Sequence, residues 1–107
     1  MNYCINETTA VFNINVNLDY NNIPAIKKII DDVLKKNKNI KSLTFDIAGV
    51  NFMDTAGLAF LILYSKKYSD NLVIFNLKED LKYIFGLDEQ GKDILQKIKK
   101  QSGKICG

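Results

Sequence analysis

The pair Asp54-Thr55 places a carboxylate next to a hydroxyl, immediately before an apolar segment. Both residue types favour the start of a helix, because their oxygens accept hydrogen bonds from the free N–H groups of the first turn. Those N–H groups and the helix dipole also favour an anion, so the domain would tolerate a phosphate on the Thr55 hydroxyl. Together with Asp54, a phosphate would make this surface strongly negative without unfolding the domain. The pair fits two interpretations, a simple helix cap and a switched docking surface.

The composition excludes several kinds of catalytic and metal site. The 107 residues include no His and no Trp, and all 15 basic residues are Lys. Without His, neither a Ser-His-Asp nor a Cys-His nucleophile can form within one chain, and two cysteines alone cannot hold zinc. Without Arg, no guanidinium can bind a phosphate or a guanine through two parallel hydrogen bonds. We expect no metal ion and no cofactor.

Two enzyme or phosphotransfer classes deserve comparison with the chain. Phe52-Met53-Asp54-Thr55 partly matches the aspartic-protease pattern of apolar residues followed by Asp-Thr-Gly, but Ala56 stands in place of the glycine. The motif also precedes a helical pattern, and no glycine-rich flap is visible. A phosphoaspartate receiver needs an acidic pair after its first strand, whereas Asp31-Asp32 lies within a helical pattern. We therefore expect that the protein is not an enzyme.

Length and hydropathy predict one domain, residues 1–107. Hydrophobic residues make up 47% and charged residues 25%, which is enough apolar material for a core. The longest apolar run, Ala56 to Tyr64, is far shorter than the roughly 20 residues that cross a bilayer. No secretory leader opens the sequence. We expect a cytoplasmic protein that makes no contact with membranes.

Hydrophobic periodicity predicts an α/β fold. Alternating residues predict strands, and apolar residues three and four apart predict helices with Asn21 or Asn22 capping the first. The expected strands are 3–5, 11–16, 43–47 and 72–75, the expected helices are 23–36, 58–65 and 78–85, and segment 94–98 fits either type. Strand, helix, strand order implies a parallel pair. We expect a small mixed sheet of four to five strands packed with three to four helices.

The excess positive charge lies at the end of the chain. Between Lys92 and Lys104 there are five lysines and one aspartate, and no aromatic residue that could stack on bases. We expect residues 92–107 to be a solvated, mobile segment that does not bind nucleic acid directly. The two cysteines, Cys4 and Cys106, are expected to be free cytosolic thiols, since nothing else indicates secretion.

The segment around the Asp-Thr pair resembles a known signature. Phe52-Met53-Asp54-Thr55-Ala56-Gly57-Leu58 is similar to the Phe-Met-Asp-Ser-Ser-Gly-Leu motif of bacterial anti-sigma-factor antagonists, the founding members of the STAS domain family. The resemblance covers nearly the whole chain. Further segments that resemble the family are Leu18-Asp19, Leu43–Asp46, Leu72–Asn76 and Leu81–Leu87.

The resemblance implies a partner-switching regulator. The unphosphorylated antagonist would bind an anti-sigma factor that is also a Ser/Thr kinase, and so release the sigma factor. The kinase would then phosphorylate Thr55 and end the complex, and a Ser/Thr phosphatase would reset it. The resemblance places the following residues on the kinase-facing surface around Thr55: Asp19, Asp54, Ala56, Gly57 and Leu58.

Two departures from the family pattern bear on this expectation. The acceptor is Thr55 where the motif commonly has Ser, and Ala56 replaces the second Ser, which leaves one acceptor in the loop. Members of the wider family also serve in stress-signalling assemblies and lipid-transport complexes without phosphorylation of this loop. A non-phosphorylated scaffold subunit of such a complex is therefore the alternative.

Overall fold

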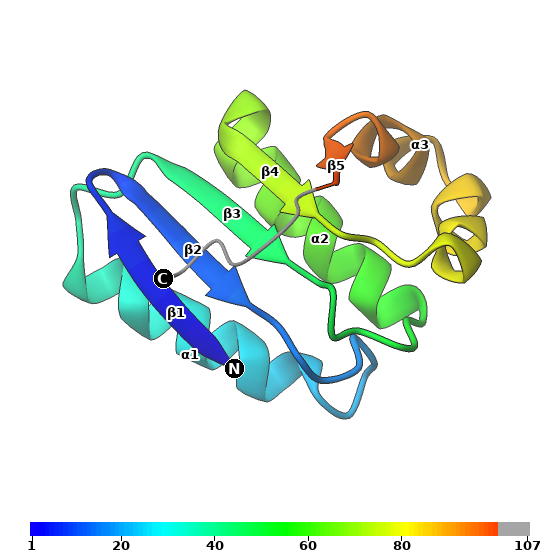
Figure 1. The fold of residues 1–107 in the computed structure, drawn as a ribbon, viewed down its shortest axis with the longest axis horizontal. Helices are drawn as coiled ribbons and strands as arrows, with labels where there is room; N and C mark the ends of the chain where they lie inside the picture. The colour runs from blue at the N-terminus through cyan, green and yellow to red at the C-terminus, as the bar shows by residue number, and fades with distance from the viewer. Residues whose placement is uncertain (101–107) are drawn as a thin grey trace.

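The computed structural model describes residues 1–100 as a five-stranded mixed sheet with its two long helices on one face (Figure 1). The strands lie in chain order across the sheet. The first two form an antiparallel hairpin, and each later strand adds in parallel to its predecessor. The strands are β1 (Asn2–Asn6), β2 (Thr9–Asn13), β3 (Ser42–Asp46), β4 (Leu72–Phe75) and β5 (Ile98–Lys99).

The helices follow the strands in the order expected of parallel crossovers. Helix α1 (Ile23–Lys36) connects β2 to β3, and α2 (Thr55–Tyr68) connects β3 to β4. After β4 come a 3₁₀ segment, η2 (Glu79–Leu87), and the short helix α3 (Glu89–Leu95), while a shorter 3₁₀ turn, η1 (Ser69–Asn71), precedes β4. The predicted single α/β domain with a small mixed sheet is confirmed.

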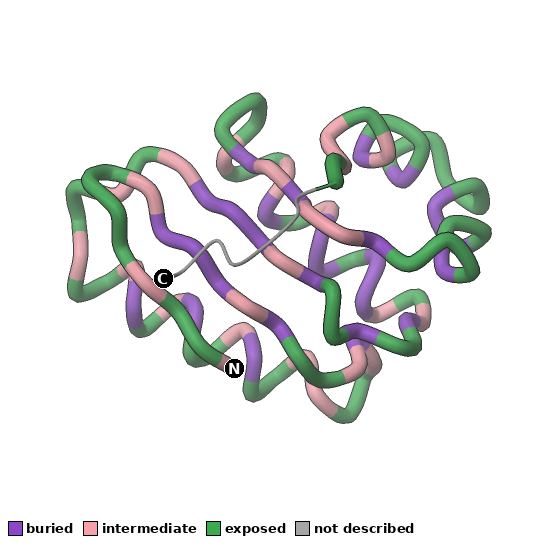
Figure 2. Tube along the Cα trace, in the orientation of Figure 1, coloured by how far each residue is buried: buried purple, intermediate pink, exposed green. Residues whose placement is uncertain are grey.

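The core lies between the sheet and α1 and α2 (Figure 2). Helix α1 buries Ile26, Ile30 and Val33, the stripe that its sequence predicts. An aromatic cluster crosses the interface to α2, with ring centroids 5.1 to 6.1 Å apart between neighbours. Its members are Phe12, Phe45, Phe60 and Tyr64. This aromatic packing fixes α2, which carries the Asp-Thr pair at its first turn.

Strand β2 begins and ends earlier than its alternation predicts. The expected strand ran to Val16, but pairing with β3 stops at Asn13 and Asp46, and Val16 is 40% exposed. Only one more contact follows, from the Ile14 N–H to the Asp46 carbonyl. The chain then turns away towards α1, so the last alternating residues belong to a loop.

The lysine-rich end of the chain is in part regular structure. Of the expected mobile segment 92–107, residues 92–100 form the end of α3, a turn and β5, and residues 101–107 lie outside the described residues. The Lys97 ammonium donates hydrogen bonds to the Ser65 hydroxyl and the Ser69 carbonyl, at the C-terminal end of α2. This lysine therefore ties the last strand to α2.

Cys4 in β1 is disulfide-bonded, so the expected free thiol is wrong at this position, and Cys106 lies outside the described residues. Within residues 1–100, no helix is both long and apolar enough to cross a membrane.

Candidate functional site

The loops that leave β2 and β3 meet beyond the carboxyl ends of these strands, where both long helices begin (Figure 1). Leu18 and Met53 form an isolated parallel bridge there. The Leu18 N–H donates to the Phe52 carbonyl at 3.0 Å, and the Asp54 N–H donates to the Leu18 carbonyl at 3.2 Å. This pairing brings the loop before α1 against the loop before α2, although 34 residues of sequence separate their contacting members.

Asp54 joins these two loops through its carboxylate. One oxygen, Oδ1, accepts hydrogen bonds from the backbone N–H groups of Ala56 at 2.9 Å and Gly57 at 3.1 Å. The other, Oδ2, accepts from the Tyr20 N–H at 3.1 Å. Asp54 is thus the N-cap of α2, as one of the two caps that the sequence allowed, and it also anchors the neighbouring loop.

Thr55 is the first residue of α2 and is exposed. Within residues 1–100 its hydroxyl takes part in no hydrogen bond, because Asp54 alone caps the helix. The hydroxyl is therefore free to react with a group from solvent or from a partner. A change at the Thr55 hydroxyl would therefore break no hydrogen bond within residues 1–100.

Asp19 has a structural role at the start of α1. Its Oδ1 accepts from the N–H groups of Asn21 at 3.1 Å and Asn22 at 3.0 Å. Asn22 occupies the expected cap position, but its side chain makes no cap and instead donates to the Asn17 carbonyl at 2.9 Å. The predicted asparagine cap is wrong in mechanism: no side chain caps α1, and the N–H of Ile23, its first residue, donates to the Asp19 carbonyl at 2.9 Å.

Gly57 and Leu58 do not reach the surface. Both are buried, and a Cβ atom added to Gly57 would lie 2.2 Å from the Leu18 carbonyl oxygen. Their expected place on a partner-facing surface is therefore corrected: they let α2 pack closely against the loop of Leu18. Ala56, Asp19 and Asp54 are half-buried beside the exposed Thr55, and their contact with a partner stays a prediction.

Two aromatic side chains near this site were missed by the sequence analysis. Tyr20 is 71% exposed and Phe52 is 46% exposed, and each lies in a segment that bonds directly to the Asp54 region. Large apolar side chains that face solvent are typical anchors of protein interfaces. The available signal was an aromatic residue in each of the two loops that precede a helix.

Side-chain hydrogen bonds also connect these two loops to each other and to the segment after β4. The Lys78 ammonium donates a hydrogen bond to the Asn51 side-chain oxygen, and the Asn51 N–H donates to Asn17 Oδ1 at 3.3 Å. In the part of the chain that the structure describes, no three His, Cys, Asp or Glu side chains gather to hold a metal ion. The arrangement places an exposed hydroxyl, Thr55, directly beside the carboxylate of Asp54.

Comparison with known proteins agrees with this geometry. A sequence profile described as the STAS domain matches residues 1–105. The chain belongs to the STAS domain family. Its fold is similar to the anti-sigma factor antagonist SpoIIAA, solved in its unphosphorylated form, at 13% identity and a TM-score of 0.72, with 92% of this chain and 84% of that chain covered.

A second structural match is to part of a much larger protein. The murine solute carrier 26 family member A9 anion transporter, solved in its inward-facing state, matches at 17% identity and a TM-score of 0.66. The match covers 86% of this chain and 16% of the transporter. At such identities the two likenesses show the fold alone. No curated protein sequence matches the chain.

Proposed function

We propose that this STAS domain is an anti-sigma-factor antagonist controlled by phosphorylation of Thr55. In the unmodified state it binds an anti-sigma factor with Ser/Thr kinase activity and so frees the sigma factor. The observation that carries the proposal is the exposed Thr55 hydroxyl, which makes no hydrogen bond within residues 1–100 and follows a helix cap that is complete without it. Its likeness to SpoIIAA supports the same partner class.

The electrostatics of the site explain how a phosphate would act. The kinase would transfer the γ-phosphoryl group of ATP to the Thr55 hydroxyl, with ADP as the leaving product and the hydroxyl proton taken by the kinase. The new group adds about −1.5 to −2 charges. Asp54 already takes the N–H groups of Ala56 and Gly57, so those donors do not neutralise it. The added charge then lies next to Asp54 and faces the partner. It repels an acidic partner surface, and against an apolar surface it would lose its hydration.

In this mechanism the domain supplies only the acceptor and the surface. The partner kinase performs the transfer, and a Ser/Thr phosphatase hydrolyses the phosphate and restores binding. We therefore propose that the protein itself is not an enzyme, needs no cofactor and binds neither nucleic acid nor membranes directly.

Intact-mass spectrometry tests the switch. The purified protein is incubated with ATP and the kinase-type anti-sigma factors of its source organism, beside Thr55→Ala and Thr55→Ser. We expect one phosphate on the native chain and on Thr55→Ser and none on Thr55→Ala. Thr55→Asp should weaken binding of the same anti-sigma factor at least about tenfold, whereas Thr55→Ala should keep it.

The alternative, a scaffold subunit that is never switched, predicts the opposite pattern. No kinase would then modify the chain, and Thr55→Asp and Thr55→Ala would bind their partner alike. That combined result, obtained with variants that remain folded, would replace the switch by the scaffold.

We also propose that the protein acts in the cytoplasm. Reductants keep most cysteines of that compartment as thiols, whereas Cys4 is disulfide-bonded in the structure, so the state of Cys4 in cells tests the location. Cells are quenched with acid and labelled with a maleimide before and after reduction. Labelling of Cys4 before reduction agrees with the cytoplasm, and labelling only after reduction contradicts it.

A further inference from the structure

A groove runs between α1 and α2, away from the site around Thr55. Its volume is about 580 Å³, and both helices and the segment after α1 line it. Lys67, on its rim, follows Thr55 by twelve residues in α2, which is about 18 Å along the helix. The groove is therefore a different surface from the one around Thr55.

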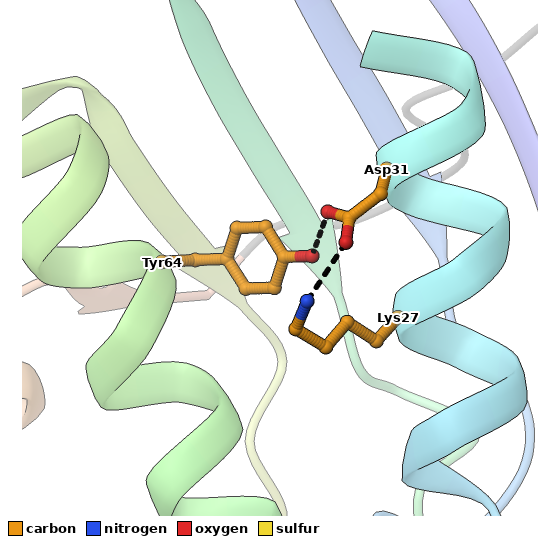
Figure 3. Close-up of polar contacts among 3 residues, drawn as sticks. All are labelled: Lys27, Asp31 and Tyr64. Carbon is orange, nitrogen blue, oxygen red and sulfur yellow. Dashed lines mark hydrogen bonds and ion pairs between the residues drawn. The ribbon is translucent and has the colours of Figure 1, made fainter. Parts of the chain in front are cut away.

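A polar contact between the helices borders the groove (Figure 3). The Tyr64 hydroxyl donates a 2.7 Å hydrogen bond across to Asp31 Oδ1, and Lys27 pairs with Asp31 Oδ2 at 2.8 Å. This contact fixes the two helices relative to each other, so the groove is preformed. Because Asp31 already has two partners, the groove presents little free negative charge.

The lining combines apolar side chains with unpaired positive charge. Leu63 is 45% exposed, and Leu34, Ile40 and Tyr68 are half-buried around it. Three further lysines on the rim, Lys35, Lys38 and Lys67, form no ion pair within residues 1–100. The matching ligand surface is apolar at its centre and carboxylate-rich at its edge.

This chain carries such a surface on another part of the molecule. Segment Glu79–Glu89 exposes Tyr83 by 62% and Leu87 by 70%, both more than any other large apolar side chain in residues 1–100 except Tyr20. Its charged residues are four carboxylates, at 79, 80, 88 and 89, and one lysine, at 82, and Lys78 and Lys92 flank it. Glu79 and Glu89 form exposed ion pairs with Lys82 and Lys92, and Asp88 caps α3, so Asp80 is the one carboxylate of the segment without an ion pair or hydrogen bond in residues 1–100. Exposed ion pairs of this kind are weak, so their carboxylates can exchange partners. Within the chain the segment packs its other side through Leu81, Ile84 and Phe85.

We propose that the segment Glu79–Glu89 of one copy docks in the α1–α2 groove of a second copy. Tyr83 and Leu87 would cover Leu63 and Tyr68, and the carboxylates would face Lys35, Lys38 and Lys67. The two surfaces differ, so the contact is heterologous and joins copies head to tail into open chains or rings. Since ion pairs at the rim contribute, added salt should weaken the association.

Sedimentation of the full chain tests the contact. Over roughly 5 μM to 1 mM, a range that captures weak association, the average mass should rise above the 12.2 kDa of one chain. K35E/K67E, which reverses two groove lysines, should weaken association at least about tenfold. K36E/K66E is the matched control, since it makes the same charge change at neighbouring helix positions that do not line the groove.

The docking segment Glu79–Glu89 is tested with a variant and a control of its own. Y83S/L87S should weaken association to the same extent, and Y20S/F52S, which removes two exposed aromatic side chains near Thr55, should not. Circular dichroism confirms that each variant is folded. A mixture of K35E/K67E with Y83S/L87S retains one groove and one docking segment, so it should form pairs and nothing larger.

Several results would overturn the proposal. A native chain that stays monomeric at 1 mM has no such contact. An equal effect of K36E/K66E would show a general charge effect, and an effect of Y20S/F52S in place of Y83S/L87S would move the contact to the Thr55 end. Growth of the mixture beyond two chains would exclude the head-to-tail arrangement.

Discussion

Asp54 makes two stabilising contacts, and its contribution to the free energy of unfolding can be measured separately from that of Thr55. It caps α2 and holds the Tyr20 N–H, whereas the Thr55 hydroxyl contributes no hydrogen bond within residues 1–100. Asp54→Ala should lower the free energy of unfolding by about 1–2 kcal/mol, the usual cost of losing such a cap. Thr55→Ala should stay within about 0.5 kcal/mol.

Urea denaturation of both variants measures this difference. If Thr55→Ala were as destabilising as Asp54→Ala, the hydroxyl would be part of the cap, and phosphorylation would disturb the fold rather than the surface alone.

Gly57 tests the close approach of α2 to the neighbouring loop. A methyl group there would lie 2.2 Å from the Leu18 carbonyl oxygen and 2.7 Å from Met53 Cγ. Gly57→Ala should therefore destabilise the domain by about 1–3 kcal/mol, as overpacking does. Gly86→Ala is the control, because a Cβ atom at that position meets nothing within 4 Å. Thermal unfolding should separate them clearly, and equal midpoints would contradict the packing argument.

For single residues, the sequence indicated which positions form the site better than it indicated what each side chain does there. The Asp54 cap follows from local chemistry, since an aspartate directly before an apolar helix has few better uses. The burial of Gly57 and Leu58 depends on the Leu18 loop, which is distant in sequence, so a motif alone placed them on the surface. The structural role of Asp19, whose carboxylate accepts from the N–H groups of Asn21 and Asn22, was not predicted, while its contact with a partner stays a prediction.

The pairing of α1 with α2 makes stability depend on pH in both directions. Burial and the hydrogen bond to Asp31 raise the pKa of the Tyr64 phenol above its usual value near 10. The stabilisation is thus complete below pH 10 and is lost as the pH rises above it. Burial opposes ionisation of Asp31, but hydrogen bonds from Lys27 and Tyr64 outweigh it and lower the pKa of this carboxyl.

Tyr64→Phe should cost about 1 kcal/mol at neutral pH, the usual net value of one hydrogen bond. It should also remove part of the loss of stability above pH 10. Asp31→Asn should flatten the loss below about pH 4, because a carboxyl whose pKa is lowered by folding stabilises only above its unfolded value. Unfolding curves from pH 2 to 11 measure both effects, with Tyr83→Phe on the exposed surface as control. Unchanged profiles would show that the helix contact is weak.

Hydrophobic periodicity predicts that a strand or helix exists better than it predicts where the element ends or which face it buries. Alternation continued through Ile14 and Val16, but a strand ends where its partner ends, and β3 offers no further pairing after Asp46. In α2 the apolar residue Leu63 is 45% exposed and lines the groove rather than the core. A nearly all-apolar helix has no strong polar face, so its orientation comes from tertiary packing.

On the scale of the whole molecule, β5 has the shortest pairing of the five strands in residues 1–100. Strand β5 pairs with β4 through two residues only, and Lys97 adds its bonds to Ser65 and Ser69. Amide hydrogen exchange should therefore be faster in β5 than in β2 and β3, which are paired on both sides over most of their length. Lys97→Gln should speed exchange in β5 without changing β3, whereas Lys92→Gln on exposed α3 should change neither.

The order of the strands bears on how the chain is made. Each strand of the sheet lies beside the one synthesised just before it, so no later strand has to enter between two earlier ones. A polypeptide emerging from the ribosome can therefore build its sheet by adding to one growing edge. The N-terminal hairpin and β3 can pair before β4 leaves the ribosome. A pause in translation would then prolong the exposure of the strand that was added last. It would not leave an unfilled position between two strands of the sheet.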